Sequence, residues 1–368
     1  MSVLEAVSDV TSGNAKVPAT GYLPEGRFPI IDQGQADVAG YTDDEGLVCR
    51  VPVPVILFGD HTRTLKYVDH PFVLGADGVK VLAPQAGWDP RYLYRALEAI
   101  DIPSAGYSRH FKFLKERSLP RPPMEEQRRI AAILDQAEAT RAGFGRSLAH
   151  VDDLVVSCFW DLFDAHSAPF RLWPRVPIGD AGDVLLGRQR GPQYQTGRCP
   201  RPYMRVANVQ MNAVKFDDVL EMDFDDRDFA KFRLRWGDVL LNEGQVTEWV
   251  GRPAMWRDEI ADCCFQNSLI RFRPRDGLVE SEFALYLFMN YVQGGVFARA
   301  SSKTSNVAHL SASRFARLSF VLPPISLQRE FATVVRAARE QAGRLERGEH
   351  LARELSASLR DGAFKGEL

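Results

Sequence analysis

The sequence has little of what marks most enzymes, secreted proteins or membrane proteins. Its five cysteines are scattered without a C-x-x-C pair, and adjacent Cys263 and Cys264 suit neither a routine disulfide nor a zinc site. No run of about 18 apolar residues is present, so we expect no membrane-spanning helix. The start, MSVLEAVSD, carries no basic segment, so we expect no secretory signal and a cytoplasmic location. The net charge of −2 indicates no particular partner.

Catalytic motifs are also missing. The sequence has no phosphate-binding P-loop, no dinucleotide-binding glycine motif, no H-E-x-x-H and no G-x-S-x-G elbow. The Asn/Asp-Pro-Pro-aromatic signature of amino-methyltransferases is absent, because Pro122-Pro123 is followed by Met124 and Pro323-Pro324 by Ile325. We therefore predict no catalytic residues and no metal site. The matched His110 and His309 are interpreted as anchors of their segments, and the acidic stretch 217–228 as a solvated loop.

What the sequence does contain is an internal repeat. The segment PPMEEQR at 122–128 reappears as PPISLQR at 323–329, an offset of 201 residues that continues without a gap to Phe163 and Phe364. Weaker sequence similarities between the two halves lie upstream. They pair residues 7–13 with 181–187, 55–59 with 238–242, and 92–97 with 283–288. Each copy is interpreted as a globular domain followed by one long helix.

Apolar residues after each Pro-Pro pair recur at alternating spacings of four and three. This spacing persists over more than four heptads, which is typical of a coiled coil. The alternative is that each helix packs only on its own domain. The residues predicted to form the helix seam are Leu134, Phe144, Leu148, Val151, Val335 and Leu345.

The globular parts contain short β-rich runs that cluster instead of alternating regularly with helices, which favours an α+β class. We predict two domains in tandem pseudo-repeat, each followed by a long helix. The predicted boundaries are 1–121 for the first domain, 122–168 for the first helix, 169–322 for the second domain and 323–368 for the second helix.

The repeat and its motifs resemble the DNA-specificity (S) subunits of type I restriction–modification systems. The likeness is carried by residues 110–130 and 309–329, which contain the Pro-Pro segments, and by residues 205–210 and 237–244. It covers nearly the whole chain. The first half departs more from the pattern, since Phe58-Gly-Asp-His61 replaces the Asn-Glu-Gly turn found at 242–244.

The resemblance implies a specificity subunit without catalysis of its own, acting in defence against phage. Two target-recognition domains would each read one half of a bipartite double-stranded DNA site, and the two helices would pair as an antiparallel coiled coil. Two methyltransferase subunits would supply S-adenosylmethionine chemistry, and restriction subunits that use ATP and Mg can join them. The chain itself would bind no cofactor.

Base reading needs side chains such as Asn and Gln for adenine or Arg for guanine. Loops rich in these types are the candidate DNA contacts. In the first half they are Asp32, Gln33, His61, Thr62, Arg63, Tyr107, Ser108, Arg109 and Lys112. In the second half they are Arg188, Gln189, Arg190, Gln193, Asn242, Gln245, Thr247, Lys303, Thr304 and Asn306.

Two other classes of function remain open from the residues alone. One is a DNA methyltransferase or nuclease with a diverged active site, which would need a cofactor-binding βαβ unit in either half. The other is an assembly adaptor whose domains bind only protein. Tight, salt-sensitive and sequence-selective DNA binding would separate the adaptor from a specificity subunit.

Overall fold

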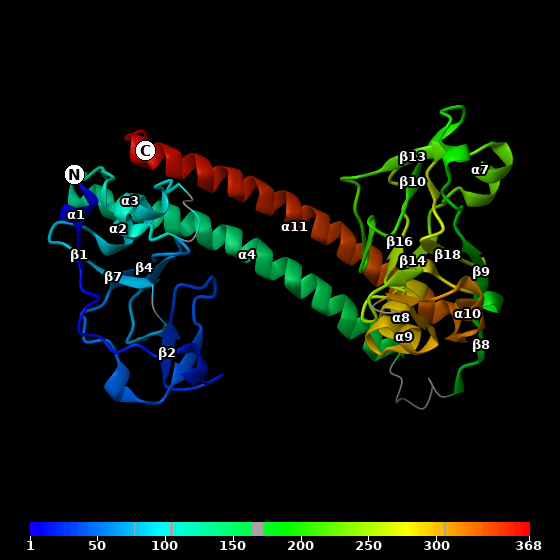
Figure 1. The fold of residues 1–368 in the computed structure, drawn as a ribbon, viewed down its shortest axis with the longest axis horizontal. Coiled ribbons are helices and arrows are strands. Elements are labelled where there is room, and N and C mark those ends of the chain that lie inside the picture. The colour runs from blue at the N-terminus through cyan, green and yellow to red at the C-terminus, as the bar shows by residue number, and fades with distance from the viewer. Residues whose placement is uncertain (77, 104–105, 107, 164–171, 305–306) are drawn as a thin grey trace. The chain divides into compact units, whose positions relative to one another are not determined.

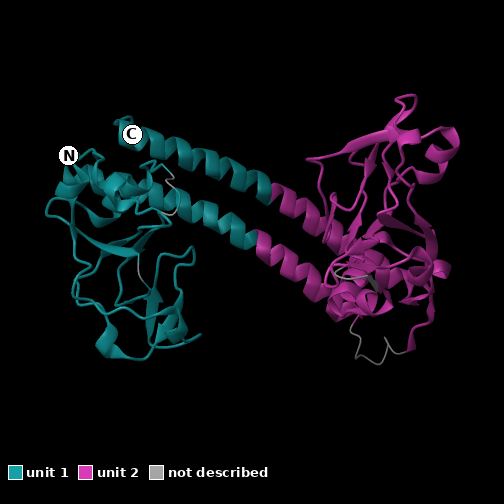
Figure 2. Cartoon of the chain, in the orientation of Figure 1, with its two compact units in different colours: residues 1–147, 345–368 teal, residues 148–344 magenta. Residues whose placement is uncertain are grey.

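The computed structural model describes residues 1–76, 78–103, 106, 108–163, 172–304 and 307–368, and it has two compact units (Figures 1 and 2). Unit 1 comprises residues 1–147 and 345–368, and unit 2 comprises residues 148–344. The division falls inside both long helices, α4 (Met124–Phe163) and α11 (Ile325–Lys365). Each unit therefore holds a globular part together with a portion of both helices. The boundaries predicted from the sequence follow the chain, not these units, and stay predictions.

Unit 1 is built on an antiparallel sheet with strand order β1-β7-β4-β5. A smaller sheet has the order β3-β2-β6, in which β2 and β6 run parallel. The elements of its globular part are α1 (Val3–Ala6), β1 (Val7–Asp9), β2 (Phe28–Ile31), β3 (Gly40–Thr42), β4 (Val55–Gly59), β5 (Leu65–Val68), β6 (Val73–Leu74), β7 (Val79–Pro84), α2 (Pro90–Glu98) and α3 (Phe111–Lys115). Short 3-10 turns lie at Ala19–Gly21 and Glu45–Leu47.

The central strand β4 has apolar side chains on both faces because each face covers a separate core. Ile56 and Phe58 belong to the cluster that includes α2, whereas Val55 and Leu57 belong to the cluster on the other face. This alternation follows from the two-residue period of a strand. It explains why residues 55–59 form a continuous apolar run.

Unit 2 repeats this plan. Its main sheet has the order β9-β18-β14-β16, and a second sheet has the order β13-β10-β17 with β10 and β17 parallel. The main elements are β8 (Arg175–Pro177), α6 (Ile178–Ala181), β9 (Gly182–Leu186), β10 (Pro200–Met204), β13 (Leu220–Asp223), α7 (Asp226–Phe232), β14 (Val239–Asn242), β16 (Pro253–Met255), β17 (Cys264–Phe265), β18 (Leu269–Pro274), α8 (Ser281–Gln293), α9 (Val296–Ala300), α10 (Ala312–Arg317) and β21 (Ser319–Val321). Smaller additions are a 3-10 turn (Pro192–Tyr194), β11 (Val209–Gln210), β12 (Ala213–Val214), β15 (Gly244–Gln245), β19 (Ser302–Thr304) and β20 (Val307–His309).

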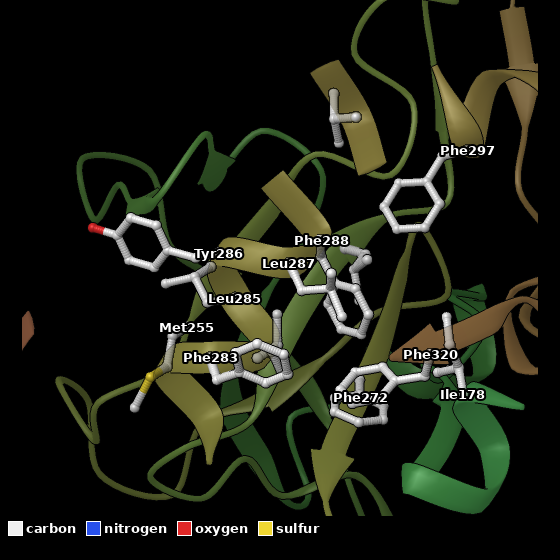
Figure 3. Packing of buried hydrophobic residues seen from close by; sticks show 14 of the residues in the cluster. Ile178, Met255, Phe272, Phe283, Leu285, Tyr286, Leu287, Phe288, Phe297 and Phe320 are labelled. Atoms are coloured by element: carbon white, nitrogen blue, oxygen red, sulfur yellow. The ribbon is translucent and has the colours of Figure 1, made fainter. Parts of the chain in front are cut away.

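The core of unit 2 is rich in aromatic rings. Phe272 of β18 packs against Phe288 of α8 and Phe320 of β21, with ring centroids 5.1 and 6.0 Å away. Figure 3 shows these rings together with Phe283 in the same cluster. Burying a large aromatic side chain is among the strongest apolar contributions to stability.

Each unit also buries residues from both long helices. In unit 1, Ile130 and Leu134 of α4 share a core cluster with Ala363 of α11. Further along, the ring of Phe144 approaches Gly348 so closely that a Cβ there would lie 2.5 Å from it. In unit 2, Val155 and Phe159 of α4 share a cluster with Phe331 and Val335 of α11.

The predicted α+β class is confirmed to the extent that helices and strands are mixed in both units. Among the described residues, no helix is long and apolar enough to cross a membrane.

Candidate nucleic-acid interface

In unit 1 the structure joins two loops that the sequence singled out. Gln33 follows β2, and His61 and Thr62 lie in the turn after β4. The Thr62 hydroxyl donates to the Gln33 carbonyl at 2.6 Å, and the His61 backbone N–H donates to the Gln33 side-chain oxygen at 3.2 Å. Gln33 thus fixes the shape of the turn that carries His61 to Arg63.

Asp32 and its neighbours are engaged within the same loop. Its carboxylate accepts from the Gly34 N–H at 2.8 Å and lies 4.0 Å from the Lys66 ammonium. Lys66 is buried, donates to the Ala36 carbonyl at 2.5 Å, and has its pKa lowered chiefly by that burial. Asp32 therefore stabilises the loop, and its carboxylate has fewer lone pairs free to accept a hydrogen bond from a DNA base.

The segment after residue 107 lies beside the same turn. His110 is buried, and its Nδ1 lies 3.0 Å from the Asp60 carbonyl oxygen, while the Phe111 N–H donates to the Asp60 carboxylate at 2.8 Å. This is the anchoring role predicted for His110. It holds exposed Arg109 and Lys112 near the residue that precedes His61.

These contacts define a first cluster of donors and acceptors in unit 1. Arg63 has a left-handed backbone (φ 64°), and its guanidinium donates to the Ile102 carbonyl at 2.8 Å. Ser108 is half-buried, and Tyr107 lies outside the described residues. The members of the first cluster are Gln33, His61, Thr62, Arg63, Arg109 and Lys112.

In unit 2 a three-stranded sheet, β15-β20-β19, brings two predicted segments together. Both Gln245 of β15 and Lys303 of β19 pair with Ala308 of β20. Thr247 is half-buried beyond the end of β15, and the backbone of Thr304 closes β19, while Asn306 lies outside the described residues. Gln245 and Thr247, with the backbone of Lys303 and Thr304, form the second cluster.

The anchor of unit 1 has a counterpart here. His309 of β20 has its Nδ1 3.3 Å from the Glu243 carboxylate, and the Leu310 N–H donates to the Glu243 carbonyl at 2.8 Å. Glu243 follows β14 as Asp60 follows β4, so each histidine segment is fastened to the end of the equivalent strand.

Two predicted contacts of unit 2 lie in its interior. Asn242 is fully buried, and Arg188 is 8% exposed. The Arg188 guanidinium lies 2.6 Å from the Asp228 carboxylate, stacks over the Tyr194 ring at 3.8 Å, and donates to the Asp223 carbonyl. The donors of Arg188 are engaged within the protein, which leaves its exposed neighbours Gln189, Arg190 and Gln193 as the accessible part of this loop.

Part of the acidic stretch is structural and not solvated as expected. Asp223 is buried and accepts from the backbone N–H groups of Thr196, Gly197 and Cys199 at 2.6, 3.0 and 2.8 Å, and from the Thr196 hydroxyl at 2.7 Å. The hydrogen bond from this hydroxyl is the main cause that lowers the pKa of Asp223. Asp223 thereby fixes the loop that follows Gln193.

The sequence reasoning missed a clamp that both units share. Gln127 is buried, accepts from the Asp89 N–H at 2.8 Å, and donates to the carbonyls of Gly87 and Pro122 at 3.1 and 2.9 Å. Asp89 is the N-cap residue of α2. Gln127 thus ties the first turn of α4 to the start of α2.

Gln328 repeats these bonds in unit 2. It accepts from the Glu280 N–H at 2.9 Å and donates to the carbonyls of Leu278 and Pro323 at 3.2 and 2.8 Å. Glu280 is the N-cap residue of α8, and its carboxylate lies 3.1 Å from the Arg329 guanidinium. The repeated Gln-Arg pair at the offset of 201 was the signal that could have identified this clamp.

The predicted seam residues differ in exposure. Leu134 and Val335 are buried, whereas Phe144, Leu148, Val151 and Leu345 are half-buried. In the described part of the chain, no group of three or more His, Cys, Asp or Glu side chains could hold a metal ion.

Comparisons with known proteins agree with this architecture. The chain is 25% identical over 113 residues to a putative type I restriction enzyme MjaX specificity subunit of Methanocaldococcus jannaschii, a match covering 31% of the chain and 27% of that relative. The chain thus spans about a quarter of the curated relative. No family model matches.

Solved structures extend the likeness to the whole chain. The S subunit of a type I restriction–modification system from M. genitalium superposes with a TM-score of 0.64 and 14% identity, covering 99% of this chain and 95% of that one. A chain from a structural study of complex assembly and conformational transition in a type I system gives 0.56 and 17%, with the same coverage. The chain has the fold of type I S subunits. The resemblance inferred from its sequence is thereby confirmed.

Proposed function

We propose that this chain is the non-catalytic specificity subunit of a type I restriction–modification complex and reads a bipartite site on double-stranded DNA. The observation that carries the proposal is the repeated plan of the two units. In each, an antiparallel sheet of the same strand order ends in a histidine-fastened turn beside side chains suited to base edges.

The two globular parts act in this proposal as target-recognition domains in tandem. The first cluster belongs to one domain, and the second cluster with the exposed loop Gln189, Arg190 and Gln193 belongs to the other. Asp32 and the buried residues Arg188 and Asn242 shape these loops from within. Arginine and lysine at the loop rims supply phosphate contacts.

Helices α4 and α11 form an antiparallel coiled coil in this proposal. Support comes from unit 1, where Leu134 shares a core cluster with Ala363 and the ring of Phe144 approaches Gly348. The contact position thus moves toward the start of α11 as it moves toward the end of α4. With 40 and 41 residues, the helices are each about 60 Å long. Their length would set the unread gap between the half-sites.

Partner subunits provide the chemistry. Two methyltransferase subunits would carry S-adenosylmethionine and modify the DNA, and restriction subunits with ATP and Mg would cleave it. This chain selects the sequence and binds none of these cofactors.

DNA binding of the chain with its methyltransferase partner tests the proposal. Fluorescence anisotropy should show a higher affinity for DNA that carries the site methylated by the complex than for other DNA. This affinity should decrease steeply as the salt concentration rises. Arg109→Gln should weaken binding, whereas Arg347→Gln, on the exposed surface of α11, should not. Sequence-independent or absent DNA binding would favour an assembly adaptor, and methylation or cleavage by the chain alone would favour an enzyme.

Insertion of four residues near Met124 or Ile325 tests the role of the helices. Four helical residues add about 6 Å, which is close to two base pairs at about 3.4 Å each. Methylated sites should keep both half-sites and gain a longer gap. An unchanged gap in an active complex would contradict the proposal that helix length sets the gap.

A further inference from the structure

Unit 1 contains a cavity that the proposed function leaves unused. It has a volume of about 670 Å³ and is lined by β5, α2 and the parts of α4 and α11 that belong to this unit. This volume lies in the range of small-molecule sites, about 300–1,000 Å³. Five arginines line it: Arg91, Arg95, Arg141, Arg353 and Arg360.

Four of these arginines are paired with carboxylates. Arg95 lies 2.8 Å from Glu98 and 2.7 Å from Asp135, and Asp135 also lies 3.5 Å from Arg91. Arg141 and Arg353 are paired with Glu138 and Glu349, each at 2.5 Å. At another wall, Lys66 lies 4.0 Å from Asp32 and is also attracted by Asp37. Four of the five lining arginines thus lie within 4 Å of a carboxylate, and Arg360 is the fifth.

Arg360 differs from the other lining arginines in its lack of a close partner. It is half-buried, and no hydrogen bond or ion pair joins it to the residues that the structure describes. The nearby Glu138 has its pKa lowered first by its hydrogen bond to Arg141, and Arg95 and Arg360 add to the same shift.

Ser356 gives a second, independent observation. It lies one helical turn before Arg360, so both side chains share a face of α11. Ser356 is only 7% exposed, lines the cavity, and its hydroxyl has no hydrogen-bond partner in the described structure. An unpaired buried hydroxyl costs stability, so a ligand that accepts its hydrogen bond would recover the loss.

The equivalent positions of unit 2 are closed by apolar packing. At the offset of 201, Phe159 stands for Arg360 and Val155 for Ser356, and Tyr286 stands for Arg95 relative to the N-cap residues of α8 and α2. The rings of Phe159 and Tyr286 stack at 6.0 Å. Unit 1 thus has polar groups where unit 2 has apolar packing.

We propose that this cavity binds a small phosphate ligand of nucleotide size, whose phosphate is held by Arg360 and Ser356. A guanidinium bonds two phosphate oxygens side by side, and a third oxygen accepts from the hydroxyl. The rings of Tyr67 and Tyr94, 5.8 Å apart, line the wall and offer apolar surface to the rest of the ligand. This inference is independent of the proposed DNA-reading role.

Calorimetry on the full chain tests the proposal with AMP and inorganic phosphate as probes. AMP should bind, and phosphate should bind more weakly. Arg360→Gln should weaken AMP binding by at least about tenfold, and Ser356→Ala by about threefold to tenfold, from the loss of charged and neutral hydrogen bonds respectively. The matched control Arg347→Gln, on the same helix outside the cavity lining, should leave affinity unchanged.

A second variant keeps the test decisive if Arg360→Gln folds poorly. The double variant Arg360→Phe with Ser356→Val installs the residues of unit 2, should raise the melting temperature, and should abolish AMP binding. Absence of AMP binding to the folded wild type, or equal loss in Arg347→Gln, would overturn the proposal. Displacement of AMP by duplex DNA that lacks the methylation site would also overturn the proposal. The cavity would then bind phosphates of the DNA backbone.

Discussion

The two places where the long helices meet a globular part share one clamp but have different interiors. In unit 2, Phe331 touches Phe159, Phe163 and Tyr286, with ring centroids 5.3, 5.7 and 5.1 Å away. In unit 1, the positions of Phe159 and Tyr286 hold Arg360 and Arg95 around a cavity. The arrangement of helices and strands therefore does not require apolar side chains at these two positions.

What the two units keep in common indicates what the fold requires. Gln127 and Gln328 make the same three hydrogen bonds, to an N-cap N–H and two carbonyls. Buried backbone groups must be paired, and one glutamine pairs three of them. The clamp is thus the shared determinant of how each helix joins its domain, whereas the interior beside it varies.

Truncating the aromatic interior should have the largest effect. Phe159→Ala is expected to lower the stability of unit 2 by about 3–5 kcal/mol, because it leaves a cavity among buried rings. Arg360→Ala, at the matched position of unit 1, should change stability by less than about 1 kcal/mol, since no bond is lost. Denaturant unfolding with hydrogen exchange resolved by unit measures both. Equal losses would show that the two interiors do not differ in energy.

Removing the clamp should affect both units alike. Gln127→Ala and Gln328→Ala should each cost about 2–4 kcal/mol, because three hydrogen bonds of about 1 kcal/mol are lost and buried backbone groups remain unpaired. The controls Gln136→Ala and Gln341→Ala, at exposed positions of the same helices, should stay within about 0.5 kcal/mol. A loss confined to one unit would refute a shared clamp.

The two N-cap residues should differ modestly. The Asp89 carboxylate accepts from the Tyr92 N–H at 3.0 Å, so Asp89→Ala should cost about 1 kcal/mol. Glu280 makes no such bond, and its partner Arg329 is largely exposed, so Glu280→Ala should cost about 0.5 kcal/mol or less. Thermal unfolding of the two variants measures which loses more stability. A larger loss in Glu280→Ala than in Asp89→Ala would contradict the assigned N-caps.

Much of the fold was predictable because the repeat places equivalent strands in equivalent positions. The similar segments at 55–59 and 238–242 became β4 and β14, and those at 92–97 and 283–288 lie in α2 and α8. Burial of individual polar residues was not predictable. Arg188 is a residue of the type that reads guanine. In the structure, however, its guanidinium is buried against the Asp228 carboxylate and the Tyr194 ring.

The cavity of unit 1 was equally hidden. The heptad pattern treats Ser356 as one more position along the helix, but in the structure its hydroxyl is buried without a hydrogen-bond partner among the described residues. Likewise, the half-burial of Phe144 depends on the close approach of Gly348, which spacing along one helix does not reveal. Such facts arise from packing between segments.

The central claim is that each half of the chain reads its own part of one DNA site. Methylation mapping tests it in a cell that expresses the chain with its methyltransferase partner, either intact or with residues 1–119 exchanged for those of another S subunit. The account predicts a methylated site of two short sequences with a fixed gap, of which the exchange changes one and leaves the other. A single uninterrupted site, or a simultaneous change of both parts, would contradict it.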